Sequence, residues 1–241
     1  MIDINSDMGE IQKLLDDGTY AEMLPYVTSI NIACGAHAGN DDIMTAMVLM
    51  AKEHGVNIGA HPSYPDREYF GRRAMAMTPA EISETVAKQI LRLQNIADKN
   101  GCALFHVKPH GALYNTAVND PGVAAAIGAG VQSVNKHLPL VGLAEVNMLT
   151  VWKKMGLKSI GEGFADRTYE SDGTLRSREL DDALITDPEK AAHQAVHMAR
   201  NETFISVDGN ELNIKVNTIC IHSDTPNAVA ISKAVHTALC A

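Results

Sequence analysis

The chain of 241 residues is 46% hydrophobic and 20% charged, which is typical of a soluble globular domain with a substantial core. Its net charge of −9, without clusters of basic residues, argues against a nucleic-acid-binding surface. The sequence has no apolar run of roughly 18 residues and no signal peptide, so we expect one cytoplasmic domain, residues 1–241, whose four widely spaced cysteines stay reduced.

Short, mostly apolar segments at seven places predict β-strands, with helical patterns between them. The predicted strands are Ile2–Ser6, Ser29–Cys34, Val56–Ala60, Ala103–Lys108, Leu140–Leu143, Ser159–Gly161 and Thr218–His222. Their nearly continuous apolar character is typical of strands that are buried on both faces of a parallel sheet.

Capping residues mark where the intervening helices begin and end. The segment Thr78–Glu81 is a capping box with proline at the first helical position, and Gly101 ends that helix. Asn40 or Asp41 caps an earlier helix, which ends before Gly55. A capping residue followed by proline predicts three further helix starts, at Asp120-Pro121, Asp187-Pro188 and Thr225-Pro226.

The segment Glu202–Val216 departs from this alternation of strands and helices. Asp208-Gly209-Asn210 lies between two alternating runs, which predicts a β-hairpin inserted before the last strand. The remaining units favour a parallel sheet, and we expect a closed seven-stranded (β/α) barrel rather than an open doubly wound sheet. The reason is that polar residues follow nearly every strand, whereas a doubly wound sheet concentrates them at one switch point.

Reactive side chains are densest around the fourth predicted strand. His106 and Lys108 share one face of an extended chain, and His110 follows directly after Pro109. Burial of such groups without partners would cost roughly 1–3 kcal/mol each, which favours a pocket. A polar layer that satisfies its own hydrogen bonds inside the barrel is the alternative.

Similar residues end the other strands, and in a parallel barrel all these ends point to the face where active sites lie. Asp3, Asn5 and Asp7 share one face of the first strand. The side chains that we expect to meet at this face are three carboxylates, five imidazoles and two cations: Asp7, Glu162, Asp166, His37, His61, His106, His110, His222, Lys108 and Arg167.

Other patterns are weaker or absent. His193 and His197 have the spacing of a helical zinc pair, but residue 194 is Gln instead of the Glu of H-E-x-x-H, which favours a solvated helix face. There is no P-loop and no complete dinucleotide fingerprint. Phosphates would therefore rely on Lys108, Arg72, Arg73, Arg167 and the amides near Thr225. Asp7, His37 and His61 are an alternative set of ligands for a divalent metal.

At these residues the sequence resembles the LamB/YcsF family over nearly the whole chain. The resemblance rests on the segments Asp3–Glu10, Asn31–Gly39, Gly59–Asp66, Val107–Asn115, Glu162–Arg167 and Ile221–Pro226. It implies a barrel of the glycoside hydrolase/deacetylase type. It also implies the role of the A component of ATP-dependent 5-oxoprolinase, which works with B and C subunits to open 5-oxoproline to L-glutamate with release of ADP and phosphate.

The implied substrate is a five-membered lactam that bears a carboxylate, and ATP, together with Mg²⁺, is the implied cofactor. We expect Lys108 to neutralise phosphoryl oxygens, Asp7 or Glu162 to act as general base, and His61 or His106 to relay a proton. The residues expected to bind substrate or phosphate are Asn5, His37, His110, Arg72, Asp166, Arg167, His222 and Thr225, with Arg167 on the carboxylate.

Two other functions stay open on the sequence alone. One is a metal-dependent deacetylase that acts on an N-acetylated sugar, and the other is a subunit that binds substrate for a catalytic partner without chemistry of its own. Homo-oligomerisation is also left open.

Overall fold

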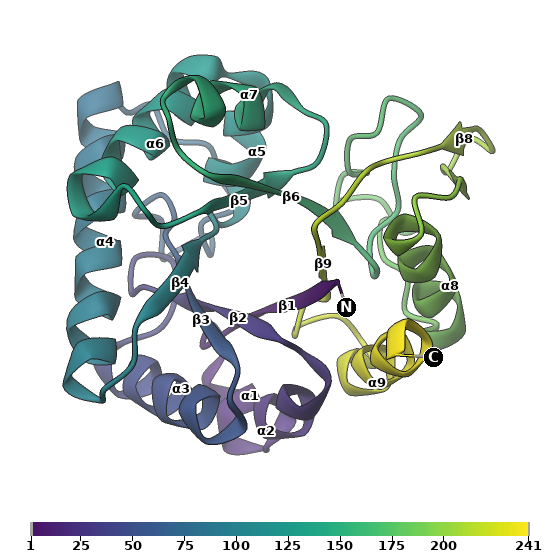
Figure 1. Cartoon of the computed structure of the whole chain (residues 1–241), viewed down its shortest axis with the longest axis horizontal. Helices are drawn as coiled ribbons and strands as arrows, with labels where there is room; N and C mark the ends of the chain where they lie inside the picture. The colour runs from purple at the N-terminus through teal and green to yellow at the C-terminus, as the bar shows by residue number, and fades with distance from the viewer. Residues whose placement is uncertain (1, 241) are drawn as a thin grey trace.

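Seven parallel strands close into a barrel in the computed structural model, which describes residues 2–240 (Figure 1). The strands are β1 (Asp3–Met8), β2 (Ser29–Ala33), β3 (Asn57–His61), β4 (Leu104–Val107), β5 (Leu140–Leu143), β6 (Ser159–Phe164) and β9 (Thr218–Cys220). The ring closes at β9, where Thr218 is in register with Asp3 of β1 and with Glu162 of β6. The predicted closed barrel is confirmed, although the two end residues of the predicted domain 1–241 lie outside the described residues.

Helices surround the barrel and cover the apolar outer faces of its strands (Figure 1). They are α1 (Gln12–Asp16), α2 (Thr19–Met23), the 3₁₀ helix η1 (Leu24–Tyr26), α3 (Asp41–His54), α4 (Pro79–Lys99), α5 (Gly111–Asn119), α6 (Pro121–Asn135), α7 (Asn147–Lys154), α8 (Pro188–Ala199) and α9 (Ala228–Cys240). The predicted caps of α3, α4, α6 and α8 are confirmed, since the side chains of Asn40, Thr78, Asp120 and Asp187 each accept a hydrogen bond from the first helical turn. No helix within residues 2–240 is both long and apolar enough to cross a membrane.

The prediction that the last helix begins at Thr225-Pro226 is wrong. α9 begins only at Ala228, because Asn227 adopts a left-handed conformation with φ of +66°, which an α-helix does not contain. The Thr225 hydroxyl donates a hydrogen bond to Asp166 Oδ2 at 2.6 Å. Thr225 therefore fastens the loop after β9 to the loop after β6.

Several strand boundaries also differ from the predicted ones. The hairpin before the last strand is confirmed, but its strands β7 (Phe204–Ile205) and β8 (Glu211–Leu212) are short. β1 and β6 extend farther than predicted, so Asp7 and Glu162 lie within strands instead of in the loops that follow them. The backbone ladder of the barrel therefore fixes the positions of these two carboxylates.

Strand alternation fills the lower barrel with a polar layer that satisfies its own hydrogen bonds. The Asp3 carboxylate accepts hydrogen bonds from the hydroxyls of Ser29 and Thr218. In the next layer toward the carboxyl ends of the strands, Asn31 Nδ2 donates a hydrogen bond to Asn5 Oδ1 at 2.8 Å. The alternative reading of the interior as a self-satisfied polar layer is thus correct for this part of the barrel.

Gly59 makes room for an imidazole in this polar layer. A Cβ atom at position 59 would lie 2.1 Å from His106 Nε2, so only glycine allows His106 to cross the interior at that height. His106 Nε2 lies 2.5 Å from Asn31 Oδ1 and therefore donates to it. This contact holds the His106 ring beneath the mouth of the barrel.

Candidate active site

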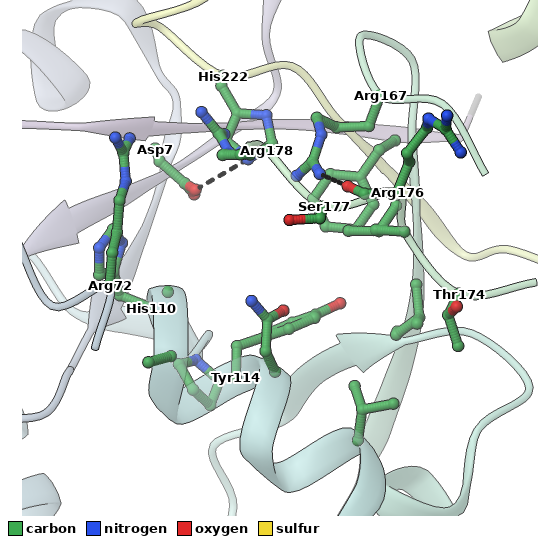
Figure 2. A pocket seen from close by; sticks show the side chains of 18 of the residues that line it. Asp7, Arg72, His110, Tyr114, Arg167, Thr174, Arg176, Ser177, Arg178 and His222 are labelled. Atoms are coloured by element: carbon green, nitrogen blue, oxygen red, sulfur yellow. Dashed lines mark hydrogen bonds and ion pairs between the residues drawn. The ribbon is translucent and has the colours of Figure 1, made fainter. Parts of the chain in front are cut away.

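A cavity of about 770 Å³ opens at the carboxyl ends of the strands, and we call it the barrel-mouth pocket (Figure 2). Its walls come from strands β1, β3, β5 and β6, from helix α5 and from the loops that follow the strands. The predicted site residues that line it are Asp7, His61, Arg72, Lys108, His110, Arg167 and His222. The other predicted site residues lie behind this lining: Asn5, His37, His106, Glu162, Asp166 and Thr225.

Lys108 lies at the floor of the pocket and is only 2% exposed. Its Nζ atom is 2.8 Å from Glu162 Oε1, 3.0 Å from Asp7 Oδ1, 3.2 Å from Asn5 Oδ1 and 3.1 Å from Cys220 Sγ. Burial alone would lower the pKa of Lys108, but the two carboxylates hold it well above its usual value. Lys108 is therefore an ammonium group whose three protons already have acceptors.

Glu162 has no free oxygen. Its Oε1 accepts hydrogen bonds from Lys108 and from Asn5 Nδ2 at 2.9 Å, and its Oε2 accepts one from the Tyr114 hydroxyl at 3.1 Å. Burial raises the pKa of Tyr114 well above the normal value, so Tyr114 remains a phenol that donates into this network. Glu162 is thus an anchor for Lys108 and Tyr114, and it is poorly placed to take a proton from a ligand.

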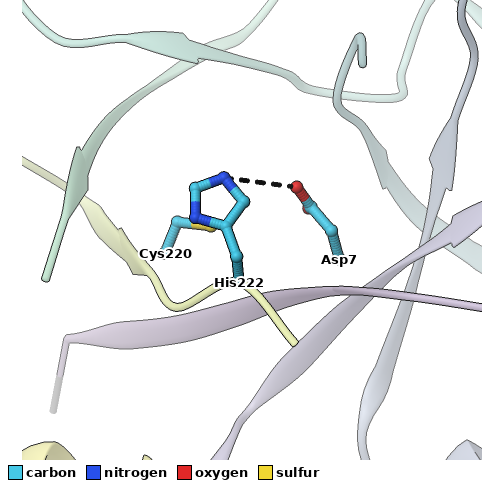
Figure 3. Close-up of side chains that lie close together, drawn as sticks. All are labelled: Asp7, Cys220 and His222. Atoms are coloured by element: carbon cyan, nitrogen blue, oxygen red, sulfur yellow. Dashed lines mark ion pairs between the residues drawn. The ribbon is translucent and has the colours of Figure 1, made fainter. Parts of the chain in front are cut away.

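Asp7 presents one of its oxygens to the pocket. Its Oδ1 accepts from Asn31 Nδ2 at 2.8 Å and from Lys108, whereas Oδ2 lies 3.4 Å from His61 Nε2 and 3.9 Å from His222 Nε2. Figure 3 shows the contact between Asp7 and His222. Burial would raise the pKa of Asp7, but His61 and Lys108 together hold it well below its usual range. Asp7 Oδ2 is therefore a charged acceptor that faces the cavity.

Both imidazoles beside Asp7 are oriented through their Nδ1 atoms. His61 Nδ1 lies 2.7 Å from the Lys108 carbonyl oxygen, which can only accept, so Nδ1 carries the proton. His222 Nδ1 lies 3.1 Å from both oxygens of Asp166. Burial would raise the pKa of Asp166, but His222 and Thr225 lower it, so Asp166 stays a carboxylate. Nε2 of each ring then points toward Asp7 Oδ2.

Glu10 is a central residue of the site that the predicted set of site residues did not include. It follows β1 after a left-handed Gly9, and its Oε1 lies 2.9 Å from both His37 Nε2 and His110 Nδ1. His110 Nε2 lies 2.8 Å from the Phe70 carbonyl oxygen. Both nitrogens of His110 therefore face acceptors, which favours the doubly protonated ring.

The charges around Glu10 agree with this assignment. Burial would lower the pKa of His110, but the Glu10 carboxylate raises it above the usual value. Burial lowers the pKa of His37 to about 4, so His37 is the neutral ring, and it stacks on His110 with ring centres 3.8 Å apart. His110 Nδ1 also lies 3.0 Å from the Nε2 lone pair of His61. A proton on His110 is therefore one hydrogen bond away from His61.

His106 and His37 do not reach the pocket. His106 belongs to the polar layer below it, and burial lowers its pKa to about 4. Both nitrogens of His37 are engaged, one with Glu10 and the other with Ser63 Oγ at 2.8 Å. These two histidines hydrogen-bond to other side chains and do not line the pocket.

The predicted metal ligands do not form a group together. Within residues 2–240, the groups whose donor atoms lie close enough to share a metal ion are Asp7 with Cys220 and His222, and Glu10 with His61 and His110. In the first group, burial raises the pKa of the Cys220 thiol well above normal, which makes it a poor ligand. In the second, the Glu10–His110 hydrogen bond occupies both donor atoms. Asp7 Oδ2 lies 3.4 Å from His61 Nε2 and 3.9 Å from His222 Nε2, but these three residues are not among the groups that could share a metal ion.

Arg167 is a buried guanidinium that forms no ion pair with any carboxylate of residues 2–240. It is 6% exposed, and it donates to the carbonyl oxygens of Ala183 at 3.2 Å and Arg176 at 2.5 Å. Burial lowers its pKa to about 10, so it keeps its charge at neutral pH. Figure 2 shows this guanidinium at the wall formed by the loop between β6 and α8. It is suited to bind an anionic group inside the pocket.

Glu10→Gln should show how far the Glu10–His110 pair stabilises the protein. We expect the free energy of unfolding near neutral pH to fall by about 1–3 kcal/mol, because buried His110 loses its charged acceptor. In wild type the His110 pKa is raised, so the stability that the pair contributes is lost as the pH rises through the folded-state pKa of His110. The Glu10 pKa is lowered, so the same contribution is also lost as the pH falls through the folded-state pKa of Glu10.

Urea unfolding at a series of pH values measures this effect, and NMR titration of the histidines reports the His110 pKa. Glu53→Gln, on the exposed face of α3, is the matched control and should change neither quantity. An unchanged His110 pKa in Glu10→Gln would contradict the assigned protonation states.

Comparisons with known proteins agree with the fold and extend over the site. The model of the LamB/YcsF family matches residues 2–241. A protein of Chloroflexus aggregans, named as the A component of 5-oxoprolinase, is 46% identical over 97% of this chain and 93% of its own length. Another of that name, from Bordetella pertussis, is 42% identical over 99% and 94%. The crystal structure of a lactam utilization protein from Thermus thermophilus has a TM-score of 0.91 and 40% identity, over 99% of this chain and 95% of that one.

Proposed function

The chain belongs to the LamB/YcsF family, and we propose that it is the subunit that opens 5-oxoproline to L-glutamate, coupled to hydrolysis of ATP to ADP and phosphate. ATP is used as its magnesium complex, and partner B and C subunits complete the enzyme. The observation that carries the proposal is the charged oxygen of Asp7, which faces the pocket between two oriented imidazoles. The names of the relatives supply the substrate.

Coupling to ATP has a physical reason. The amide of an unstrained five-membered lactam resists water, and transfer of a phosphoryl group to its oxygen makes the ring carbon electrophilic. Addition of one water and cleavage of the C–N bond then give the open chain with an acyl phosphate. A second water releases phosphate and leaves glutamate. The protein must therefore bind the substrate carboxylate, take a proton from water and give a proton to the leaving nitrogen.

Three residues of the barrel-mouth pocket match these tasks. Arg167 binds the substrate carboxylate, because it is a fixed guanidinium with no carboxylate of its own. Asp7 Oδ2 takes the proton of the attacking water as general base. His61 passes a proton to the leaving nitrogen: its Nε2 faces the cavity, takes the proton from His110 Nδ1, which lies 3.0 Å away, and then donates it.

Lys108 has a different task from the one expected. Because four acceptors surround its three protons, it holds Asp7 and Glu162 in place and leaves phosphoryl oxygens to other cations. His222, fixed by Asp166 and Thr225, forms the wall beside Asp7.

The decisive assay measures glutamate and ADP formed from 5-oxoproline and ATP, with and without candidate B and C subunits. We expect equal amounts of the two products only when this chain and its partners are present together. Complete assemblies that form no glutamate would contradict the proposal. Turnover that survives substitution of Asp7 would instead favour a subunit that only binds the substrate.

One observation favours a second candidate, a metal-dependent deacetylase. Metal-binding histidines usually donate their other ring nitrogen to a carbonyl or carboxylate, as His61 and His222 do here. Together with Asp7 they would hold a divalent ion that supplies activated water, once the two rings move closer to each other. A stoichiometric transition metal in the purified protein and loss of activity with a chelator support this function, whereas chelator-insensitive turnover of 5-oxoproline contradicts it.

A further inference from the structure

We propose that Arg72 and Arg178, at the entrance of the barrel-mouth pocket, form a binding site for the phosphoryl oxygens of a phosphate-class anion. The inference rests on the proposed function, because the reaction brings phosphate groups to this pocket. It starts from Lys108, the cation of the floor, which has no free proton for a ligand. The phosphoryl charge must therefore meet other cations.

Arg72 and Arg178 converge on a single oxygen of Asp224. Arg72 Nη2 lies 2.8 Å and Arg178 Nη1 lies 3.5 Å from Asp224 Oδ2. The three residues come from the loops after β3, β6 and β9, which are far apart in the sequence and meet at the entrance. The fold thus brings two guanidinium groups within reach of one oxyanion.

The positive charge of Arg72 and Arg178 is only partly neutralised by acidic side chains. Two guanidiniums share one carboxylate, whereas the neighbouring Arg176 is paired with both Glu170 at 3.0 Å and Asp182 at 2.5 Å. The other acidic side chains that line the entrance make no ion pair with Arg72 or Arg178; they are Asp172, which bonds to Thr174, and Glu179. A phosphate dianion would balance the two guanidiniums better than Asp224 does, and it offers enough oxygens for both.

The entrance site is also linked to the acid–base groups. The guanidinium of Arg72 lies 5.0 Å from the ring centre of Phe70, whose carbonyl oxygen accepts the hydrogen bond from His110. Asp224 follows His222 by two positions. Figure 2 shows Arg72, Arg167 and Arg178 around the same opening as Asp7. Two anion subsites follow, one at Arg167 for a carboxylate and one at the entrance for a phosphoryl group.

In the free protein, Asp224 occupies the position that the anion takes in the complex. Side chains at this site are partly exposed, with 47% for Arg72, 29% for Arg178 and 19% for Asp224, so they can rearrange without unfolding. Entry of the anion would displace Asp224 from both guanidiniums.

Calorimetric titration of the isolated chain with pyrophosphate tests this site without 5-oxoproline or partner subunits. We expect Arg72→Gln and Arg178→Gln each to weaken binding by about tenfold or more, because each removes a charged hydrogen bond. Asp224→Asn should tighten binding. The matched control is Arg73→Gln, which removes the same charge at the adjacent position. Arg73 is suitable because it packs over the Tyr69 ring and does not line the pocket.

A parallel titration with ADP and with inorganic phosphate identifies the source of the anion. Tighter binding of ADP assigns the site to a nucleotide, and equal binding assigns it to the phosphate group alone. The proposal fails if pyrophosphate does not bind, or if Arg73→Gln weakens binding as much as the two entrance variants do. A protein that binds pyrophosphate here but forms no glutamate in the complete assembly would contradict only the proposed function.

Discussion

Asp7→Asn should lower the turnover of 5-oxoproline by the assembled enzyme by about 10²- to 10⁴-fold, the range typical of a lost general base. The fold should survive, because an asparagine oxygen can replace Oδ1 as the acceptor for Asn31 and Lys108. Its amide group would then take the position of Oδ2 and donate toward the Nε2 lone pairs of His61 and His222. The variant thus removes the base and keeps the hydrogen bonds.

Glutamate release measures the effect, and thermal unfolding confirms that the variant is folded. Asp172→Asn is the matched control, because it removes a carboxylate that also lines the pocket but contacts only Thr174. Its turnover should stay within about threefold of wild type, as expected for an exposed carboxylate without a charged partner. Wild-type turnover in Asp7→Asn would remove Asp7 from the mechanism.

Most of the fold could be predicted because local signals agreed with the tertiary structure. The capping residues Asn40, Thr78, Asp120 and Asp187 begin helices as expected, since each bonds to the turn that it precedes. Thr225 carries the same signal but fails, because its hydroxyl has a partner from a distant loop, Asp166. A capping pattern depends only on neighbouring residues, so it cannot predict the competing hydrogen bond between Thr225 and Asp166, which are 59 positions apart.

Strand alternation predicted which side chains face the inside of the barrel but not their depth. His106 and Lys108 are two positions apart on one face, and only Lys108 lines the pocket. The difference depends on the stagger between strands, as in the register shift between β3 and β4, which places His106 opposite Gly59. The spacing of residues in the sequence does not determine the register between neighbouring strands, so this difference in depth could not be predicted.

The residues that were missed lie where the chain turns. Glu10 comes after a left-handed Gly9, which interrupts the alternation that marked Asp7. Arg178 lies on the long loop between β6 and α8, which has no periodic pattern, and its partner Asp224 is on another loop. For Glu10, a usable signal was present: a third acidic residue beside Asp3 and Asp7, near several predicted imidazoles.

Replacement of Lys108 by methionine should be the most destabilising of these changes, with a loss of about 3–5 kcal/mol in the free energy of unfolding near neutral pH. Methionine has a similar length but no charge, so Asp7 and Glu162 would stay buried without their shared cation. Lys88→Met is the matched control. It breaks an exposed pair with Glu84 on α4, which should cost under about 0.5 kcal/mol.

The pH dependence separates lost charge pairing from lost packing. In wild type the Asp7 pKa is lowered, so Asp7 contributes stability above its unfolded pKa and loses it as the pH falls through the folded value. Without Lys108 this contribution shrinks, so the gap between Lys108→Met and wild type should narrow at acidic pH. A second variant, Lys108→Met with Glu162→Gln, should recover part of the loss, since one uncompensated charge is removed. A gap that is constant with pH, with no recovery in the double variant, would mean that Lys108 acts through packing and not as the cation that holds both carboxylates.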